Sequence, residues 1–174
     1  MGYVDLHVHT THSDGALSPA QMVAKAKAAG VTTLAIADHD KISGSQEAAP
    51  LCARAGIRLI PAAEVDTVLR GVLVHVLAYF PDFANAAFLA MLQDSRAKLD
   101  GMSDILIDRL AARGKNVSRE EYAFFPEMRE KGGWKALYYL AHKGIVAAPK
   151  QALRLYGDYG VRYADQGFIA TENA

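Results

Sequence analysis

Four short apolar runs in the first 80 residues restrict the fold more than any other feature, because amphipathic stretches separate them. The runs cover residues 4–8, 31–37, 57–62 and 72–79. Apolar runs of this length, bounded by turn residues, predict buried strands. Strands that alternate with helices are usually parallel neighbours joined by helical crossovers. The sequence therefore predicts an α/β fold, built as a sheet or a barrel.

The helix signals between these runs support the same alternation. Ser18 and Pro19 suit the N-cap and the first position of a helix, and Gly30 is expected to end it. Ser43 predicts the cap of a second helix, and Gly56 predicts the end of that helix. Two helices are thus expected between the first three strands.

The sequence becomes mostly helical after Pro81. Helices are expected at residues 84–113, after a capping box at 118–121, at 134–143 and at 150–156. Glycines follow or close three of these patterns, at Gly114, Gly144 and Gly157. The chain therefore divides into an α/β part, up to about residue 80, and a helical part.

The composition argues against several classes of protein. The 19 basic and 19 acidic residues cancel, so bulk charge does not favour a stable nucleic-acid complex. Cys52 is the single cysteine, which leaves neither an internal disulfide nor a thiolate metal cluster. No apolar run approaches the roughly 20 residues that a membrane span needs. We expect a cytoplasmic protein without a membrane partner.

Histidines and carboxylates gather at the ends of the first three predicted strands, and one histidine lies within the fourth. Those at the strand ends are His7, His9, Asp38, His39, Asp40, Glu64 and Asp66, and the one within the fourth strand is His75. His7 and His9 are two residues apart in an extended segment, so their side chains project to the same side. The carboxyl ends of parallel strands meet at one edge, where α/β proteins build their sites. We therefore expect these side chains to lie close together.

Each signal has an ordinary explanation when it is taken alone. Pairs such as His7 and His9 also occur in ordinary strands, and acidic residues around His39 are typical of a turn. Residues 13–15 form a common turn sequence, Ser-Asp-Gly. A histidine inside an apolar strand, such as His75, is more often a hydrogen-bonded core residue than a ligand. The combination of all these signals favours a functional site.

The charge of this set predicts metal ions. Asp14, Asp38 and Glu64 would crowd negative charge into one crevice, and Lys41 is the only base in these loops. Burying carboxylates without partners is costly, and divalent cations remove that cost. Nitrogen and oxygen donors without sulfur suit zinc, manganese or iron. A glutamate such as Glu64 can bridge two ions held about 3.5–4 Å apart.

Residues outside this set receive simpler interpretations. His12 is expected in a solvated loop, with substrate contact as the alternative. Trp134, Tyr138 and Tyr139 are expected to pack the helical part against the sheet. His142 is expected near the C-terminus of a helix, where a cation is favourable.

Several motifs together resemble the PHP superfamily, named for polymerase and histidinol phosphatase. They are Asp5-Leu6-His7-Val8-His9-Thr10, Ser13-Asp14-Gly15 with Ser18-Pro19, Ala37-Asp38-His39-Asp40, Ala63-Glu64-Val65 and Val74-His75-Val76-Leu77. Their order is similar to that in the stand-alone phosphoesterases of the family, near the branch that acts on nucleotide and oligonucleotide phosphates. The likeness is specific over residues 3–80. Residues 81–170 resemble the helical insertion of those proteins more faintly.

The resemblance implies a distorted (β/α)7 barrel with two or three divalent metal ions at its C-terminal face. Residues 1–80 would form the N-terminal part of an incomplete barrel. Residues 81–174 would form a mostly helical insertion and the start of the remaining barrel segment. The implied activity is that of a hydrolase. A metal-activated hydroxide would attack a phosphomonoester, or a nucleotide or oligonucleotide phosphate.

The resemblance also assigns roles to individual residues. The implied metal ligands are His7, His9, Asp14, His39, Glu64 and His75. Glu64 would bridge two ions, whereas Asp14 and His39 would hold a third. Asp38 and Asp40 match catalytic positions behind the ligands, where they would orient His39 or transfer protons.

The sequence departs from this family pattern after the fourth predicted strand. A His-Pro strand end and an Asp-x-His motif, which would supply the remaining ligands, have no match here. The chain is therefore a fragment, or a second chain or a homo-oligomer completes the barrel, or part of the chemistry is lost. An unpaired strand edge favours association. The expected partner is a phosphate-bearing small molecule or nucleotide, and the alternative function is a non-catalytic module that binds metal or phosphate.

Overall fold

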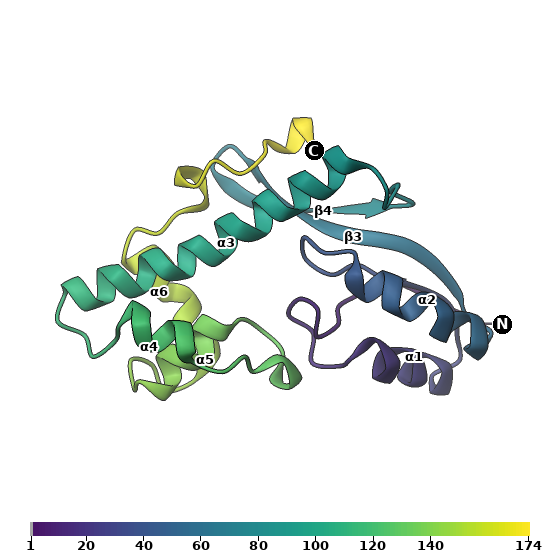
Figure 1. Ribbon diagram of the computed structural model, residues 1–174, viewed down its shortest axis with the longest axis horizontal. Helices are drawn as coiled ribbons and strands as arrows, with labels where there is room; N and C mark the ends of the chain where they lie inside the picture. Colours follow the sequence, from purple (N-terminus) through teal and green to yellow (C-terminus); the bar gives the residue numbers. More distant parts are fainter. Residues whose placement is uncertain (1) are drawn as a thin grey trace.

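The computed structural model describes residues 2–174 and contains one curled sheet of four strands (Figure 1). In their order across the sheet, the strands are β1 (Tyr3–Val8), β2 (Val31–Ile36), β3 (Arg58–Leu69) and β4 (Val72–Tyr79). Strands β1, β2 and β3 are parallel, whereas β3 and β4 form an antiparallel hairpin. The predicted α/β fold is confirmed.

Two helices pack against the first three strands (Figure 1). Helix α1 (Pro19–Ala28) begins with a capping box, in which Ser18 and Gln21 each accept a hydrogen bond from the other's backbone N–H. Helix α2 (Ser43–Ala55) ends at Gly56, whose φ of 72° is left-handed. The core between helices and strands contains Val23, Ala26, Leu34, Ile36, Ala48, Cys52 and Ile57.

Ser43 does not cap α2, contrary to the sequence prediction. Ile42 occupies the N-cap position without a side-chain hydrogen bond, and Ser43 is the first helical residue. The Ser43 hydroxyl lies 2.8 Å from Nδ1 of His12, and Nε2 of His12 lies 2.9 Å from a carboxylate oxygen of Glu47. His12 is thus tied to α2 by both ring nitrogens, rather than free in a solvated loop.

Strand β3 is longer than predicted, and β4 runs in the opposite direction to the other strands. Strand β3 continues to Leu69 and turns into β4 at Arg70 and Gly71, with φ values of 50° and 83°. Two residues with positive φ suit the twist of a tight hairpin. The prediction ended this strand early because Glu64 and Asp66 are acidic, but both carboxylates are buried and paired with histidines.

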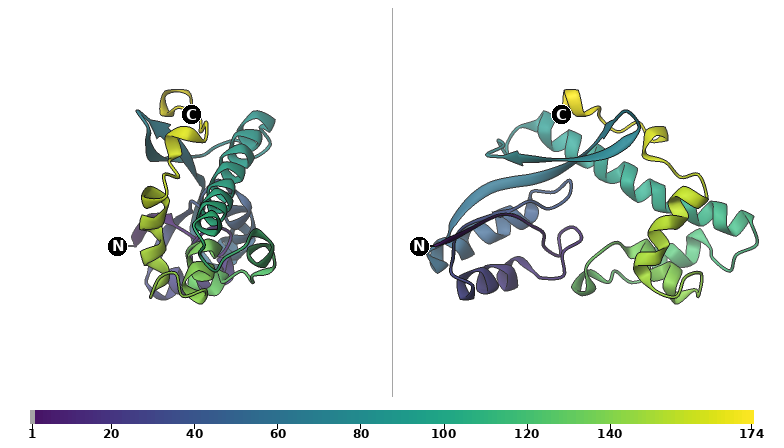
Figure 2. Two further views of the ribbon diagram at one scale, coloured as in Figure 1. Left: turned by 90° about the vertical axis from the view of Figure 1, so that its left-hand side faces the viewer. Right: turned by 180° about the vertical axis from the view of Figure 1, so that it is seen from behind.

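The remaining chain forms a helical lobe around one long helix (Figure 2). Its helices are α3 (Ala86–Ala112), α4 (Arg119–Phe124), α5 (Lys135–His142) and α6 (Leu153–Asp158), with short 3-10 turns at Arg129–Lys131, Pro149–Ala152, Tyr163–Asp165 and Thr171–Asn173. Ser118 caps α4 as predicted, but the Glu121 carboxylate binds Lys143 rather than the N-cap. Gly157 lies inside α6, and the chain turns at Gly160 instead.

The last residues of the chain run beside the β3–β4 hairpin (Figure 2). The Val68 N–H donates to the Ile169 carbonyl over 3.0 Å, and the hydroxyls of Thr67 and Thr171 lie 2.8 Å apart. These contacts join the helical lobe to the sheet. Among the residues that the structure describes, no helix is long and apolar enough to span a membrane.

Candidate metal centre

The end of β1 brings two imidazoles onto one carboxylate. Nε2 of His7 and Nε2 of His9 lie 3.0 Å apart. Both nitrogens approach the same oxygen of Glu64, at 3.0 Å for His7 and 2.8 Å for His9. The alternation of side chains along an extended strand explains why two histidines separated by one residue reach the same place. Three donor atoms therefore converge on one point.

The loop after β1 adds Asp14 to this group, and Asp38 holds the loop in place. Oδ1 of Asp14 lies 2.6 Å from Nδ1 of His9. The Asp38 carboxylate is fully buried and accepts hydrogen bonds from the backbone N–H and the hydroxyl of Thr10, both at 2.7 Å, and from the hydroxyl of Ser13 at 2.6 Å. Buried carboxylates need such donors. Asp38 thereby fixes the positions of His9 and Asp14.

Strand β3 supplies the central carboxylate of the site. Glu64 is buried, and one of its oxygens also lies 3.6 Å from Nε2 of His39, which follows β2. Its other oxygen lies 3.6 Å from Nδ1 of His75 in β4. The hairpin makes this possible, because the antiparallel register places His75 directly opposite Asp66, two residues beyond Glu64. Glu64 therefore connects side chains from all four strands or the loops that follow them.

Asp66 forms a second link between His39 and His75. One oxygen of its carboxylate lies 3.0 Å from Nδ1 of His39 and 2.6 Å from Nδ1 of His75. Its backbone N–H donates to Oδ1 of Asp40 over 3.1 Å. Asp40 has a left-handed φ of 50°, and its Oδ2 is buried without a hydrogen-bond partner in the described residues.

The donor atoms fit divalent metal ions. Three overlapping sets each offer one donor atom per residue within 4.8 Å of the others: His7, His9 and Glu64; His9, Asp14 and His39; and His39, Glu64 and His75. Tetrahedral zinc with bonds of about 2.0–2.1 Å separates its ligand atoms by about 3.3 Å. The 2.8–3.0 Å separations around Glu64 require only a small expansion to reach this geometry. Imidazole and carboxylate donors also suit manganese and iron.

The electrostatics of the site reflect its crowded carboxylates. Burial alone would lower the pKa of His9, but hydrogen bonds with Asp14 and Glu64 outweigh burial and raise this pKa to about 10. Burial alone would raise the pKa of Glu64, but its hydrogen bonds with histidines lower that pKa to about 2. Burial and the charge of Asp66 raise the pKa of Asp40 to about 8. Imidazolium ions thus balance the carboxylates, and metal ions would displace their protons.

The structure brings together every residue that the sequence predicts as a metal ligand: His7, His9, Asp14, His39, Glu64 and His75. Glu64 lies within β3 rather than after it, and His75 lies on an antiparallel strand. Asp38 and Asp40 contact neighbours of the proposed ligands. Asp38 accepts a hydrogen bond from Thr10 in the loop after β1, and Asp40 accepts one from the backbone N–H of Asp66. The contact to His39 that was expected of them is made by Asp66.

The aromatic predictions for the helical lobe are met only in part. Trp134 does lie between the lobe and the site, since its ring centroid is 5.8 Å from that of His39 and Arg96 stacks on it at 4.4 Å. Tyr139 is buried within the helical core instead. The hydroxyl of Tyr138 donates to backbone carbonyls of its own lobe.

Gly44 offers a test of how closely α2 packs against Asp38 and the loop after β1. A Cβ atom at this position would lie 2.0 Å from Oδ2 of Asp38 and 2.7 Å from the Thr10 hydroxyl. We expect Gly44→Ala to lower the free energy of unfolding by about 1–3 kcal/mol in urea titrations, because the overpacked site must move. Gly101→Ala is the matched control, because nothing lies within 4 Å of Gly101 in α3. It should be neutral or stabilising by up to about 1 kcal/mol, and equal losses in both variants would contradict the expectation.

The fold and this cluster define an α/β protein whose histidines and carboxylates can bind metal ions. The chain belongs to the PHP family, because the model of the PHP domain matches residues 5–171. The incomplete PHP-type barrel expected from the sequence is therefore confirmed, with its four strands forming part of the barrel sheet.

Relatives of known name support this assignment. The chain is 34% identical over 145 residues to the 5'-3' exoribonuclease Rnm of Salmonella typhimurium, covering 82% of this chain and 44% of the relative. It is 38% identical over 96 residues to a 3',5'-nucleoside bisphosphate phosphatase of Chromobacterium violaceum, covering 55% of this chain and 34% of the relative. A solved amidohydrolase structure from Chromobacterium violaceum, with bound sulfate and no metal, aligns with a TM-score of 0.70 and 28% identity, covering 87% of this chain and 54% of that chain. The chain thus spans less than half the length of these curated relatives.

Proposed function

We propose that this chain forms the metal-binding part of a phosphoesterase that hydrolyses phosphomonoesters, or nucleotide or oligonucleotide phosphates. The observation that carries the proposal is the set of three overlapping donor groups, two of which include Glu64. The names of the relatives, an exoribonuclease and a nucleoside bisphosphate phosphatase, support phosphate esters of nucleotides as substrates. Two or three divalent ions, of zinc, manganese or iron, would occupy these groups.

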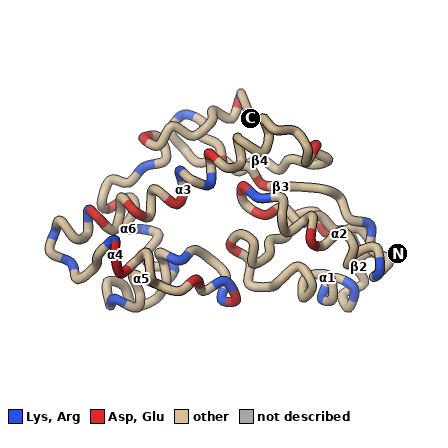
Figure 3. The backbone as a smooth tube through the Cα atoms, viewed as in Figure 1, with Lys and Arg blue, Asp and Glu red and all other residues tan. Residues whose placement is uncertain are grey.

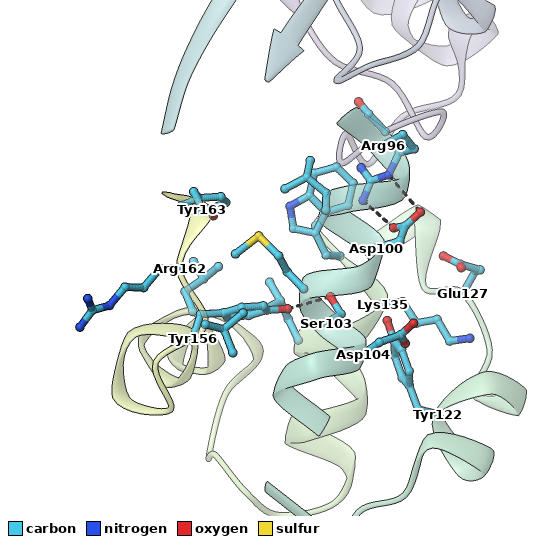
Figure 4. Close-up of a pocket in the computed structure, with 18 of the residues that line it drawn as sticks. Arg96, Asp100, Ser103, Asp104, Tyr122, Glu127, Lys135, Tyr156, Arg162 and Tyr163 are labelled. Atoms are coloured by element: carbon cyan, nitrogen blue, oxygen red, sulfur yellow. Dashed lines mark hydrogen bonds and ion pairs between the residues drawn. The ribbon is translucent and has the colours of Figure 1, made fainter. Parts of the chain in front are cut away.

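A cavity beside the metal centre supports a phosphate-bearing substrate (Figure 4). Its volume is about 800 Å³, and its walls come from both the helical lobe and the loops near the metal centre. Lys41, Arg96 and Arg129 line it. Arg96 pairs with Asp100, but within residues 2–174 neither Lys41 nor Arg129 lies within 4.0 Å of a carboxylate. Basic and acidic residues are spread over the whole chain (Figure 3), and Asp100, Asp104 and Glu127 also line this cavity. Arg129 donates a hydrogen bond to the Thr11 carbonyl over 3.4 Å, but neither Arg129 nor Lys41 is paired with these carboxylates, so both cations can bind an anion.

The residues around the site suggest how they would act on such a substrate. Bound divalent ions would stabilise the negative charge that develops on the phosphoryl oxygens and would lower the pKa of water. Lys41 and Arg129 would hold a phosphate oxygen. The half-buried ring of Trp134, which lines the cavity, would contact an apolar or aromatic part of the substrate. Asp38 would keep the loop of His9 and Asp14 in place. The helical lobe supports this loop as well, since the Gly133 N–H donates to the Asp14 carbonyl over 2.7 Å.

The proposal is tested with the purified chain after removal and addition of metal. Metal content is measured for zinc, manganese and iron, and hydrolysis is measured with a generic phosphomonoester, a nucleoside 3',5'-bisphosphate and a 5'-phosphorylated oligoribonucleotide. We expect stoichiometric metal and metal-dependent release of phosphate or nucleotide. Stoichiometric metal without turnover would favour the alternative, a non-catalytic binding module. A chain that binds no metal would overturn both functions.

Arg129 provides a test of the substrate cavity. We expect Arg129→Gln to raise the KM for a phosphomonoester about 10-fold or more with a smaller effect on kcat, because hydrogen bonds to charged groups contribute about 1.5–3 kcal/mol. Arg154→Gln is the matched control, because Arg154 is exposed on α6 and does not line the cavity. Steady-state kinetics of both variants check the expectation, and an unchanged KM for Arg129→Gln would contradict it.

A further inference from the structure

We propose that Asp66 is the positioning residue that fixes the ring orientation and tautomer of both His39 and His75. This inference rests on the proposed function in one respect, because it explains how His39, one of the proposed ligands, presents a lone pair to the metal centre. Its central claim concerns the protonation pattern of the rings, which can be measured without turnover. Nothing in the motif pattern of the sequence distinguishes Asp66 from its acidic neighbours.

The geometry determines which ring nitrogen carries hydrogen in His39 and in His75. A single oxygen of Asp66 lies 3.0 Å from Nδ1 of His39 and 2.6 Å from Nδ1 of His75. An ionised carboxylate only accepts hydrogen bonds, so both Nδ1 atoms must carry hydrogen. A neutral imidazole with hydrogen on Nδ1 has its lone pair on Nε2. In His39 that Nε2 faces the metal centre, at 3.6 Å from Glu64 and 4.0 Å from Asp14.

No other carboxylate in the described residues takes this role. Asp38 is occupied by Thr10 and Ser13. Glu64 lies 3.6 Å from Nδ1 of His75, which is too long for a hydrogen bond, and it approaches His39 from the Nε2 side. Asp66 therefore contacts His39 at Nδ1, whereas the proposed ligands Asp14 and Glu64 lie on the side of Nε2.

Asp66 is itself held on several sides, as a positioning residue needs to be. Its side chain is almost fully buried. Its backbone N–H donates to Asp40, and its backbone carbonyl accepts from the hydroxyl of Ser95 in α3 over 3.1 Å. The register of the hairpin places it directly opposite His75. Contacts with the loop after β2, with α3 and with β4 thus fix the backbone of Asp66 before any ion binds.

The first experiment is NMR of the wild-type chain, with its histidine rings labelled with nitrogen-15. Long-range nitrogen–proton spectra report which ring nitrogen carries hydrogen, in the metal-free chain at alkaline pH and again after addition of zinc. We expect hydrogen on Nδ1 of both His39 and His75 in each state. Hydrogen on Nε2 of either neutral ring would overturn the proposal. If the rings show the expected pattern but zinc does not bind, the proposed function fails while the positioning role stands.

The second experiment compares Asp66→Asn with Asp94→Asn. Asparagine keeps the size of the side chain, but its NH2 group can donate to Nδ1 and so favour hydrogen on Nε2. We expect a shifted tautomer at His39 or His75 and a 10–100-fold loss of zinc affinity, measured by competition with a chelator. Asp94 lies on the surface of α3, where it pairs with Lys98, and its variant should match the wild type. Unchanged tautomers and affinity in a folded Asp66→Asn chain would also overturn the proposal.

Discussion

Glu64→Gln is expected to lower the metal-dependent hydrolysis of a phosphomonoester by about 10³-fold and to reduce the number of bound ions. Glu64 belongs to two of the three donor groups and is their only carboxylate, and histidines approach both of its oxygens. The amide has the same shape but no charge, and its NH2 group cannot act as a ligand. Loss of one preorganised electrostatic contact costs about 10²–10³ in rate, and loss of an ion adds to that cost.

The control for this prediction is Glu120→Gln, which makes the same change on an exposed turn of α4. Its metal content and its kcat/KM should equal those of the wild type. Metal content is measured by elemental analysis after gel filtration, and kcat/KM by release of phosphate. A Glu64→Gln protein with full metal content and full activity would exclude the arrangement proposed here.

Removal of metal is expected to produce the second large effect, which is a loss of thermal stability. A ligand that binds only the folded state adds about 2.7 kcal/mol when its concentration is 100 times its Kd. For a chain of this size that corresponds to a rise of about 5–10 °C in Tm for each ion. Calorimetry of the chain with a chelator and with added zinc or manganese measures the difference. His7→Ala should remove a large part of this gain in Tm. His7 is one of three donors in its group, and its loss leaves only His9 and Glu64 to hold that ion.

The pH dependence of this effect has a definite sign. In the metal-free chain the raised pKa of His9 adds stability below about pH 6.5, and that stability is lost as the pH rises toward about 10. Metal binding requires neutral imidazole, so metal affinity should increase over the same range. The stabilisation by metal should therefore grow from pH 6 to pH 8. A Tm difference that is constant over this range would show that the ions do not displace protons from these histidines.

Much of the fold follows from local signals in the sequence. The cap at Ser18, the left-handed end of α2 at Gly56 and the bounds of β4 all agree with the prediction, because backbone geometry and apolar runs act over short distances. The length of β3 did not follow, since buried acids such as Glu64 imitate the end of a strand. Only the partners of these acids, which lie far away in the sequence, make their burial favourable.

In the candidate site too, some features could be predicted from the sequence, whereas others depend on contacts between distant residues. Its proposed ligands could be named from the sequence because the motifs that contain them resemble those of the PHP superfamily. The role of Asp66 could not, because it depends on the hairpin register that sets it opposite His75. The link between His12 and Glu47 was missed for a similar reason, since the two residues belong to a loop and a helix that meet only in the folded chain.

The two-residue turn at Arg70 and Gly71 has a consequence for the whole metal centre. Side chains alternate along a strand, so a slip of the hairpin by one residue would point His75 to the opposite face of the sheet. The turn therefore determines the geometry of the proposed metal centre, although it contributes no donor atom. Insertions or deletions at Arg70 and Gly71 should weaken metal binding by the centre while leaving most of the secondary structure intact.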